Sequence, residues 1–410
     1  MRILIPTIGS RGDVQPYVNL AQGLLEAGHE VRIASNPTLR DLVETHGVPF
    51  APVGRPVDMG VEGARLLEQS FGNMWLGLIR VMQLGARLVE EAFPEVLDAC
   101  RGVDLVITSD SSAGAAEAQS LGVPWITVTL QPARLPTDRG QRGPVGRLSA
   151  RVVGRALVAP TNRFRKRVGA PAVADMTAMM SARMVLLPVS RAVAQRNPAW
   201  AHQVRQTGYW FAREATGWQP PRDLAEFLSA GDKPIVVSLG VMGVSGKAAR
   251  QSAAIVLEAV RRAGVRAVLQ GWDPALLASL GASSHVYPAG SLPHGWLFGE
   301  AAAVVHHGGF GTTAAGLRSG VPSIVIPHII DQFAWGQMVH ELGAGPPPIS
   351  RTKLSPRALA QAIEAALHDE RVIAKAASVG QAIRDEPDGV SEAVKLIEGL
   401  GVEEGSRDEV

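Results

Sequence analysis

The residues with the clearest capacity for chemistry lie in one glycine-rich stretch, His306-His307-Gly308-Gly309-Phe310-Gly311-Thr312-Thr313. A short apolar strand, Ala302–Val305, precedes it, and a helix of small residues follows it. Glycines let a ligand approach the backbone closely, and a helix start offers free N–H groups and the positive end of the helix dipole. The pattern therefore predicts a site for an anion. Asp331 and Gln332 follow the next buried strand at its carboxyl end, where open α/β sheets bind ligands.

Strands and helices alternate along both halves of the chain. The first half begins with a strand at Ile3–Ile8, a loop at Gly9–Asp13 and a helix that we expect to start at Val14. A second series begins at Pro234–Gly240. This alternation predicts an α/β fold with parallel, doubly wound sheets. We place a first domain at residues 1–215, a linker at 216–233, a second domain at 234–385, and a C-terminal helix and tail at 386–410.

Composition narrows the class of protein. The chain has 410 residues, 46% of them hydrophobic and 19% charged, which suits a globular protein with two domains. A net charge of +2 gives no general case for nucleic acid. Cys100 is the only cysteine, which excludes an internal disulfide and a cysteine-based metal site. The first strand begins at Ile3, and no apolar run approaches the ~20 residues of a membrane span. We therefore expect a cytoplasmic protein, either soluble or peripherally bound to a membrane.

Two segments leave alternatives open. Apolar residues recur at roughly helical spacing between residues 71 and 82: Phe71, Met74, Trp75, Leu78, Ile79 and Met82. They form either ordinary core or an adaptable apolar wall for a ligand. The stretch from Arg134 to Arg167 is rich in arginine, with Asp138 as its only acidic residue. It is either a solvated surface or a basic surface for anionic lipid or an acidic acceptor.

The ordered set HHGGFGTTAAGLRSGVP, DQ and VHELGAGPPPIS resembles the donor-binding signature of the GT-B glycosyltransferases of family 1, the UDP-glycosyltransferases. It is most similar to the branch of sterol glucosyltransferases and bacterial natural-product enzymes, including those of antibiotic biosynthesis. The resemblance implies two Rossmann-like domains with an interdomain cleft and a last helix that crosses back to the first domain. It also implies metal-independent, inverting transfer of a glucose-like hexose from a UDP- or TDP-sugar, with no cofactor. The acceptor would be a hydroxyl of a sterol, terpenoid or polyketide, and the product a β-glycoside.

The resemblance assigns donor-binding roles in the second half of the chain. His307 would hydrogen-bond the diphosphate, and Asp331 and Gln332 would hold sugar hydroxyls. The further donor-binding residues would be Gly240, Ser291, Leu292, Gly309, Gly311, Thr312 and Thr313. The alternatives are a structural role for His307 and helix capping for Asp331 and Gln332. We expect His306 to pack or to cap. Val241, Ser291 and Ala315 depart from the family pattern, so recognition of the base and ribose is not carried over.

On the acceptor side, GSRGDVQP resembles the loop in which bacterial relatives carry an aspartate as general base. Asp13 would take that role beside Gly12, with capping of the following helix as the alternative. Asp110 matches the aspartate that assists the base in plant relatives, and two carboxylates in contact would raise one pKa. Asp110 as a turn residue is the alternative. The acceptor would bind near Gly12, Phe71, Met74, Trp75, Ile79 and Met82.

A non-catalytic GT-B protein that binds a nucleotide sugar or a lipid is the rival hypothesis. Val241, which replaces a phosphate-binding serine, favours it. The presence of Asp13, His307, Asp331 and Gln332 favours an enzyme.

Overall fold

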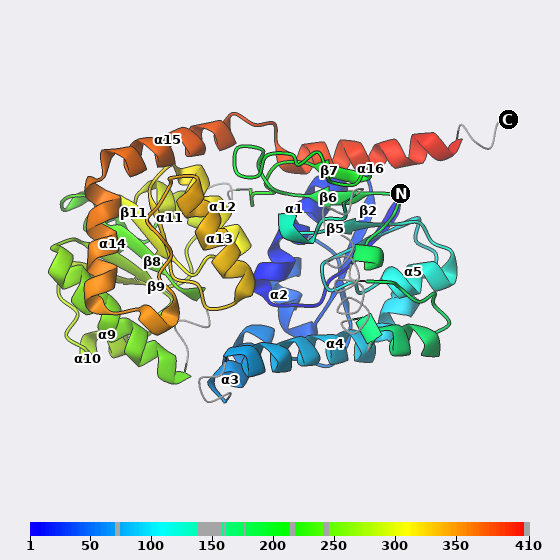
Figure 1. Cartoon of the computed structure of the whole chain (residues 1–410), viewed down its shortest axis with the longest axis horizontal. Helices are drawn as coiled ribbons and strands as arrows, with labels where there is room; N and C mark the ends of the chain where they lie inside the picture. The colour runs from blue at the N-terminus through cyan, green and yellow to red at the C-terminus, as the bar shows by residue number, and fades with distance from the viewer. Residues whose placement is uncertain are drawn as a thin grey trace, which may run out of the picture. The chain divides into compact units, whose positions relative to one another are not determined.

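The computed structural model describes residues 1–69, 74–137, 158–159, 161–175, 177–213, 218–240 and 246–405. The chain forms two compact units, each built on a parallel sheet (Figure 1). Unit 1 comprises Met1–Met59, Ile79–Phe211 and Pro387–Val410, and unit 2 comprises Gly60–Leu78 and Ala212–Glu386. The predicted α/β class, with two doubly wound sheets, is confirmed.

Unit 1 is organised around a seven-stranded sheet with the order β3-β2-β1-β4-β5-β6-β7. Its strands are buried apolar runs, such as Ile3–Ile5, because crossover helices cover both faces of a parallel sheet. The elements are β1 (Arg2–Pro6), α1 (Arg11–Glu26), β2 (Glu30–Ser35), η1 (Pro37–Leu39), α2 (Arg40–Glu44), β3 (Phe50–Pro52), α4 (Met74–Ala99), β4 (Leu105–Thr108), α5 (Ala115–Leu121), β5 (Trp125–Val128), η2 (Pro132–Arg134), η3 (Thr177–Met179), β6 (Val185–Leu187), β7 (Val204–Gln206) and α16 (Gly389–Gly405).

The helix α16 packs against α1, so the C-terminal part of the described chain completes unit 1. A Cβ atom on Gly23 of α1 would lie only 2.3 Å from Cγ1 of Val390, and one on Gly389 would lie 2.5 Å from the Tyr209 carbonyl oxygen. Gly23 therefore lets α16 approach α1 closely, and Gly389 lets the start of α16 approach the backbone of the segment after β7.

Unit 2 is organised around a five-stranded sheet with the order β10-β9-β8-β11-β12. Alternate residues of its strands face opposite layers of helices, so Val237 and Val305 pack toward α9 and α14, whereas Val236 and Val304 pack toward α7, α11 and α12. The elements are α3 (Met59–Glu68), α7 (Arg222–Ser229), β8 (Ile235–Ser238), α9 (Gly246–Ala263), β9 (Ala267–Gln270), α10 (Pro274–Ser279), β10 (Val286–Ala289), α11 (His294–Gly299), β11 (Ala303–His306), α12 (Phe310–Ser319), β12 (Ser323–Val325), α13 (Ile330–Glu341), η4 (Arg351–Lys353), α14 (Pro356–His368) and α15 (Glu370–Arg384).

The segment 216–233, which we expected to be a linker, contains the helix α7. Its Leu224 is fully buried in the core of unit 2, beside Val236 and Val268. Burial of one leucine contributes about 1.5–3 kcal/mol, which ties this segment to the unit.

Both sheets reverse their direction of winding at one point, between β1 and β4 in unit 1 and between β8 and β11 in unit 2. The loops on either side of such a switch point diverge and leave a crevice at the carboxyl ends of the strands. Asp13 follows β1 and Asp110 follows β4, while Gly240 follows β8 and His307 follows β11. The topology therefore places these pairs where open α/β sheets bind ligands.

Candidate active site

Asp13 lies in the first turn of α1, which begins at Arg11 and not at Val14. Ser10 is the N-cap residue, and Oδ2 of Asp13 accepts hydrogen bonds from the Ser10 backbone N–H (2.7 Å) and hydroxyl (2.8 Å). This is the reciprocal arrangement of a capping box, in which an acidic third residue bonds back to the cap. Asp13 therefore does help to cap α1, as the alternative proposed, but as the third helical residue and not as the N-cap itself. The Ser10-x-x-Asp13 spacing is the sequence signal that could have shown it.

Capping uses only one carboxylate oxygen of Asp13. No described residue hydrogen-bonds its Oδ1, and the side chain is exposed. Protein atoms still crowd the loop, and this desolvation raises the pKa of Asp13, while the Ser10 hydrogen bonds oppose the shift. A Cβ atom on Gly9 would lie 2.7 Å from both Cβ and Oδ2 of Asp13, so only glycine fits there. The loop thus holds the carboxylate by one oxygen and leaves the other for a substrate.

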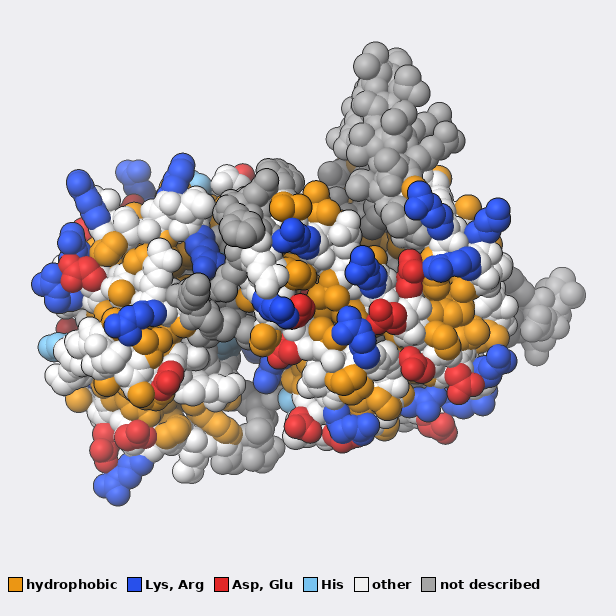
Figure 2. Space-filling model, turned by 90° about the horizontal axis from the view of Figure 1, so that it is seen from below, with side chains coloured by type: hydrophobic (Ala, Val, Ile, Leu, Met, Phe, Trp, Pro, Cys, Tyr) orange, Lys and Arg blue, Asp and Glu red, His pale blue; other side chains and the backbone are white. Residues whose placement is uncertain are grey.

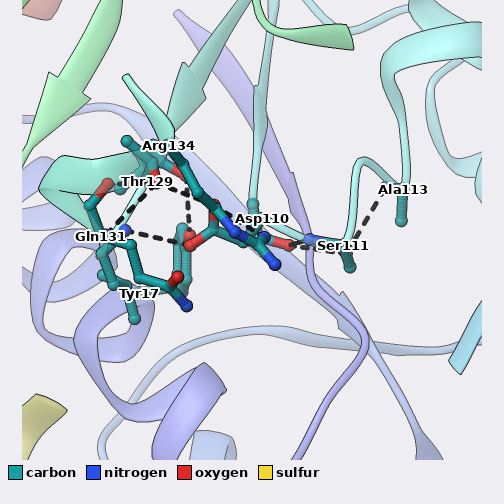
Figure 3. A network of polar contacts seen from close by, with 10 residues as sticks. Tyr17, Asp110, Ser111, Ala113, Thr129, Gln131 and Arg134 are labelled. Carbon is teal, nitrogen blue, oxygen red and sulfur yellow. Dashed lines mark hydrogen bonds and ion pairs between the residues drawn. The ribbon is translucent and has the colours of Figure 1, made fainter. Parts of the chain in front are cut away.

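Asp110 is enclosed by hydrogen bonds within unit 1 (Figure 3). Its Oδ1 accepts from the Thr129 hydroxyl at 2.8 Å, and its Oδ2 accepts from the Leu130 backbone N–H at 3.0 Å. Arg134 forms an ion pair with Oδ1 at 3.5 Å. Asp110 therefore joins the end of β4 to the loop after β5. This is more than the role of a turn residue, which was the alternative for Asp110.

The loop after β4 is also tied to the loop after β1. The Ile8 backbone N–H donates to Oγ of Ser111 at 3.5 Å, and that oxygen lies 2.7 Å from Oγ of Ser109. Among the described residues other than glycine, Ser112 alone has a positive φ, 58°. Strained backbone of this kind is concentrated at functional sites. Three loops of unit 1 therefore share one hydrogen-bonded edge around Asp13.

The two histidines of the glycine-rich loop have different environments. His306 is fully buried, its Nδ1 accepts from the Gly308 backbone N–H at 3.1 Å, and burial lowers its pKa to about 3. The expectation that it packs and caps is confirmed. His307 is partly exposed, and its Nδ1 makes no hydrogen bond of normal geometry. Burial lowers the pKa of His307, with the nearby Ser238 backbone opposing the shift, so its ring is neutral near pH 7.

The helix α12 begins at Phe310 with Gly309 as its N-cap. The Thr313 N–H already donates to the Gly309 carbonyl at 2.8 Å, and the Thr313 hydroxyl is fully buried. The contribution of Thr313 to a ligand stays a prediction: its N–H is used inside the first turn, whereas its buried hydroxyl has no partner among the described residues. The backbone N–H groups of the first three helical positions, Phe310 to Thr312, have no partner within the helix, as at any helix start.

Close packing around His307 explains two of the glycines. A Cβ atom on Gly309 would lie 2.4 Å from Nε2 of His307, and one on Gly240 would lie 3.0 Å from its Cε1. Gly240 also has a φ of +64°, which favours glycine. A Cβ atom on Gly311, in contrast, would meet no atom of the described residues within 4 Å. Gly309 and Gly240 therefore fix the imidazole, whereas no described residue restricts a side chain at position 311.

Gln332 acts as a cap at the start of α13. Its Oε1 accepts from the backbone N–H groups of His328 at 2.8 Å and Ile329 at 3.3 Å, and the residue is buried. The capping alternative therefore holds for its carbonyl oxygen. Asp331 lies beside it in the first turn of α13 and is partly exposed.

Ser291 and Leu292 follow β10 at the same edge of unit 2. Ser291 is exposed, and the Leu292 carbonyl accepts from Nε2 of Gln270 at 3.1 Å. The Gln270 Oε1 atom lies 2.9 Å from Nε2 of His294, so a small polar network fixes this loop. The segment 241–245, which contains Val241, lies outside the described residues.

Two families match the chain in sequence. The one described as glycosyltransferase family 28 N-terminal domain matches residues 3–117, and the one described as erythromycin biosynthesis protein CIII-like, C-terminal domain, matches residues 277–399. A sterol 3-beta-glucosyltransferase of Emericella nidulans is 33% identical over 424 residues, which include 97% of this chain. The chain belongs to the family 1 GT-B glycosyltransferases.

The curated relatives are longer than this chain. The Emericella nidulans protein matches over 30% of its own length, and a sterol 3-beta-glucosyltransferase of Eremothecium gossypii, 32% identical, over 33%. The chain thus spans about a third of these curated relatives. Among solved structures, the glycosyltransferase SnogD from Streptomyces nogalater has a TM-score of 0.72 at 24% identity, covering 97% of this chain and 99% of its own. The glycosyltransferase SsfS6 of Streptomyces sp. SF2575 has a TM-score of 0.67 at 23% identity, with the same coverage.

The apolar stripe between residues 71 and 82 is not ordinary core where its side chains are described. Ile79 is 49% exposed and Met82 is 56% exposed, both on α4. Figure 2 shows the face of the molecule that carries α4, where hydrophobic side chains are interspersed with lysine and arginine. Phe71 and the side chains of Met74 and Trp75 lie outside the described residues.

Part of the basic stretch from Arg134 to Arg167 lies among the described residues. Arg165 is buried and bonds the Gln119 side chain and the Pro171 carbonyl, so it does not contribute to a basic surface. Arg167 is exposed and pairs with Glu90 at 2.8 Å. Residues 138–157 lie outside the described part.

In the described part of the chain, no three or more His, Cys, Asp or Glu side chains gather in a group that could hold a metal ion. No helix among those residues has the length and apolar character needed to cross a bilayer.

Proposed function

We propose that this protein transfers a hexose from a nucleoside diphosphate sugar to a hydroxyl group of a large hydrophobic acceptor. The observation that carries the proposal is the state of Asp13, whose carboxylate is anchored through one oxygen and exposes the other. It lies at the switch point of a sheet, where an acceptor hydroxyl could reach it. A free carboxylate oxygen in that place is suited to remove a proton.

The donor would bind unit 2 through its diphosphate. The N-terminus of α12 and the dipole of that helix favour an anion, and the neutral His307 adds a hydrogen bond. Structures of related glycosyltransferases support this class of donor, because SsfS6 was solved with thymidine diphosphate and VinC with dTDP. Asp331 and the amide nitrogen of Gln332 would hold the sugar hydroxyls.

The reaction would be one inverting displacement. Oδ1 of Asp13 takes the hydroxyl proton of the acceptor while the acceptor oxygen bonds to the anomeric carbon. The bond from that carbon to the diphosphate oxygen breaks, and the diphosphate leaves with the electron pair. The α12 N-terminus and His307 stabilise the charge that develops on the leaving group, so the proposal needs no metal ion. An α-linked donor then gives a β-glycoside.

The acceptor class is inferred from relatives and from α4. The curated relatives are named sterol 3-beta-glucosyltransferases, and Ile79 and Met82 offer exposed apolar surface on unit 1. Burial of apolar area contributes about 25 cal/mol per Å², so a sterol, terpenoid or polyketide would gain more than a small polar alcohol. Leu76, which is 39% exposed on the same helix, would add to this apolar surface.

The same helix supports a peripheral contact with an anionic membrane as a finer proposal. Exposed apolar residues of α4 and nearby basic side chains share the face that Figure 2 shows. Surface attraction to anionic lipid fades within a Debye length. Co-sedimentation with anionic and neutral liposomes, at low and high salt, tests it; equal binding to both at low salt would contradict an electrostatic contact.

The activity is tested by incubation with radiolabelled UDP-glucose or TDP-glucose and a panel of sterols, polyketides and short alcohols. We expect labelled glycosides of the apolar acceptors, insensitive to a metal chelator. Binding of the nucleotide sugar without transfer to any acceptor would favour the non-catalytic alternative. Equal turnover of short alcohols would contradict the acceptor class.

A further inference from the structure

Unit 2 contains a cavity that shares no residue with the proposed donor site. Its volume is about 70 Å³, and it is partly open to solvent. It lies between the helix α9, the segment that follows β12 and the 3-10 helix η4, and its apolar lining comes from Leu239, Ile255 and Leu354. One water needs about 10–15 Å³ of such volume, so the cavity has room for a group of the size of phosphate.

The imidazole of His328 is the most buried polar group of the lining. His328 is 8% exposed, and its Nδ1 is buried without a hydrogen-bond partner among the described residues. Its backbone N–H donates to Oε1 of Gln332 at 2.8 Å, which fixes the main chain at this point. Desolvation, with smaller contributions from His307 and Arg351, lowers the pKa of His328 to about 3. The ring is therefore neutral near pH 7 and has one N–H group to donate.

Arg351 brings a cation to the same cavity. It begins η4, and the chain just before it is joined to β12 by a hydrogen bond from the Ile349 N–H to the Val325 carbonyl at 2.9 Å. The Lys353 N–H closes the turn by donating to the Ser350 carbonyl at 2.8 Å. The Arg351 side chain is exposed, and no described carboxylate forms an ion pair with it. The backbone thus holds this arginine at the cavity, and its charge has no counter-ion in the described part of the chain.

The α9 side of the cavity adds neutral polar groups. Ser252 is already bonded within the protein, because its Oγ accepts from Nε1 of Trp272 at 3.2 Å and donates to the Ala249 carbonyl at 3.0 Å. Gln251 is exposed, and its side-chain amide makes no hydrogen bond to a described residue. None of the described residues that line the cavity is acidic. The guanidinium, amide and imidazole donors therefore suit an oxyanion and not a metal cation.

We propose that this cavity binds a small oxyanion of the phosphate class, with Arg351 and Gln251 at its entrance and His328 at its buried end. Arg351 would supply the charge and two parallel N–H donors, a geometry that matches phosphate oxygens. His328 would donate its ring N–H to a further oxygen. The ligand is either free phosphate or the phosphate group of a small phosphomonoester. The site is separate from the start of α12, so the inference goes beyond the proposed transfer reaction.

Nuclear magnetic resonance of the imidazole rings tests this site in the whole chain. The His328 signal is assigned as the one lost in His328→Gln, and nucleoside diphosphate is added in excess so that phosphate is kept out of the proposed donor site. Titration with inorganic phosphate at pH 7 should then move the His328 signal saturably. Arg351→Met should weaken phosphate binding about tenfold or more, because a charge-assisted hydrogen bond is lost. Gln251→Leu should weaken it about threefold, and Arg351→Lys, which keeps the charge, should bind more tightly than Arg351→Met.

Arg222→Met is the matched control, because it removes an exposed arginine of unit 2 that pairs with Glu226 at 2.8 Å and does not line the cavity. Its phosphate affinity should equal that of wild type. A second titration with glycerol 3-phosphate identifies the source: tighter binding of the ester indicates a phosphorylated small molecule, whereas equal or weaker binding indicates the free ion.

A His328 signal that does not respond to phosphate, or equal phosphate affinity in wild type and Arg351→Met, would overturn the proposal. The response of the His307 signal to nucleoside diphosphate is recorded in the same samples. Failure of the donor site is therefore distinguished from failure of the cavity, because each is reported by its own histidine.

Discussion

The loop after β1 and the loop after β11 follow central strands of two similar sheets, yet they satisfy their polar groups differently. In unit 1, Asp13 and Asp110 accept hydrogen bonds from their own and neighbouring loops. In unit 2, Nε2 of His306, Nδ1 of His307 and Oγ1 of Thr313 are buried without a partner among the described residues. A buried polar group left without a partner costs about 1–3 kcal/mol. The carboxylates Asp13 and Asp110 are therefore fixed by internal bonds. Oγ1 of Thr7, in the first loop, also has no partner among the described residues, but the second loop leaves more of its polar groups with hydrogen-bonding capacity.

Asp13→Asn is expected to have the largest effect on the first loop. The amide can still accept the hydrogen bonds of Ser10 but cannot remove a proton, so kcat should fall about 10²- to 10⁴-fold. The donor KM should stay near wild type. Ser10→Ala is the matched control, because it removes one anchoring bond and keeps the carboxylate. If Asp13→Asn retained more than about a tenth of wild-type turnover, Asp13 would be a capping residue only.

His307→Ala should weaken donor binding and kcat/KM by about 1.5–3 kcal/mol, through loss of a hydrogen bond to a charged group. His306→Ala should instead lower the melting temperature, because it opens a cavity in the core and leaves the Gly308 N–H unpaired. Titration calorimetry with nucleoside diphosphate and thermal melting, run on both variants, distinguish these outcomes. Equal, small effects on donor binding would remove the role assigned to His307.

Gly309→Ala and Gly311→Ala test whether the donor approaches the backbone of the second loop. The added methyl group at 309 would meet Nε2 of His307 at 2.4 Å, so the imidazole must move even without a ligand. The methyl group at 311 meets no atom of the described residues within 4 Å. We expect the imidazole NMR signals of the free protein to change in Gly309→Ala only, and donor affinity to fall about tenfold in both. Unchanged affinity in Gly311→Ala would mean that the donor does not approach this turn.

Glu117 is an exception to this difference between the two units. It is a buried carboxyl group of unit 1, and its Oε1 has no partner among the described residues. Desolvation raises its pKa to about 7 from 4.5, with backbone hydrogen bonds and Arg165 opposing the shift. The folded state then binds more protons than the unfolded state, so stability falls as pH rises from about 4.5 to about 7.

Glu117→Gln should remove this loss. The variant should match wild type below pH 4.5 and exceed it above pH 7 by an amount on the order of 3 kcal/mol. Thermal melting across pH measures the difference. A variant less stable than wild type at every pH would show that the carboxylate is ionised and paired with Arg165.

The sequence was informative where glycine spacing and strand order decide the structure. The doubly wound sheets and the helix after HHGGFG were predicted, and the switch points coincide with the loops of Asp13 and His307. That His306 packs or caps was also predicted, because the family resemblance gives it no role in donor binding.

The hydrogen bonds and ion pairs of individual side chains were harder to predict, because they depend on residues that are distant in the sequence. The capping oxygen of Gln332 and the buried hydroxyl of Thr313 follow from where α13 and α12 start, which spacing fixes only to within a few residues. The ion pair of Arg134 joins loops that follow different strands, and its arginine was hidden among many others in the basic stretch. The exposure of Ile79 and Met82 could not be predicted, because a helix in the core shows the same apolar pattern as a helix with an exposed apolar face.

The packing of α16 on α1 has a consequence for the order in which the units are completed during synthesis. The ribosome delivers β1 and α1 early, but the helix that covers Gly23 comes only after Glu386, when all residues of unit 2 have been made. Unit 1 is therefore begun first and completed last. Until α16 arrives, its contact surface on α1 stays open, and nascent chains that expose such surfaces depend on chaperones. Unit 2, in contrast, has its whole sheet available as soon as its own segment leaves the ribosome.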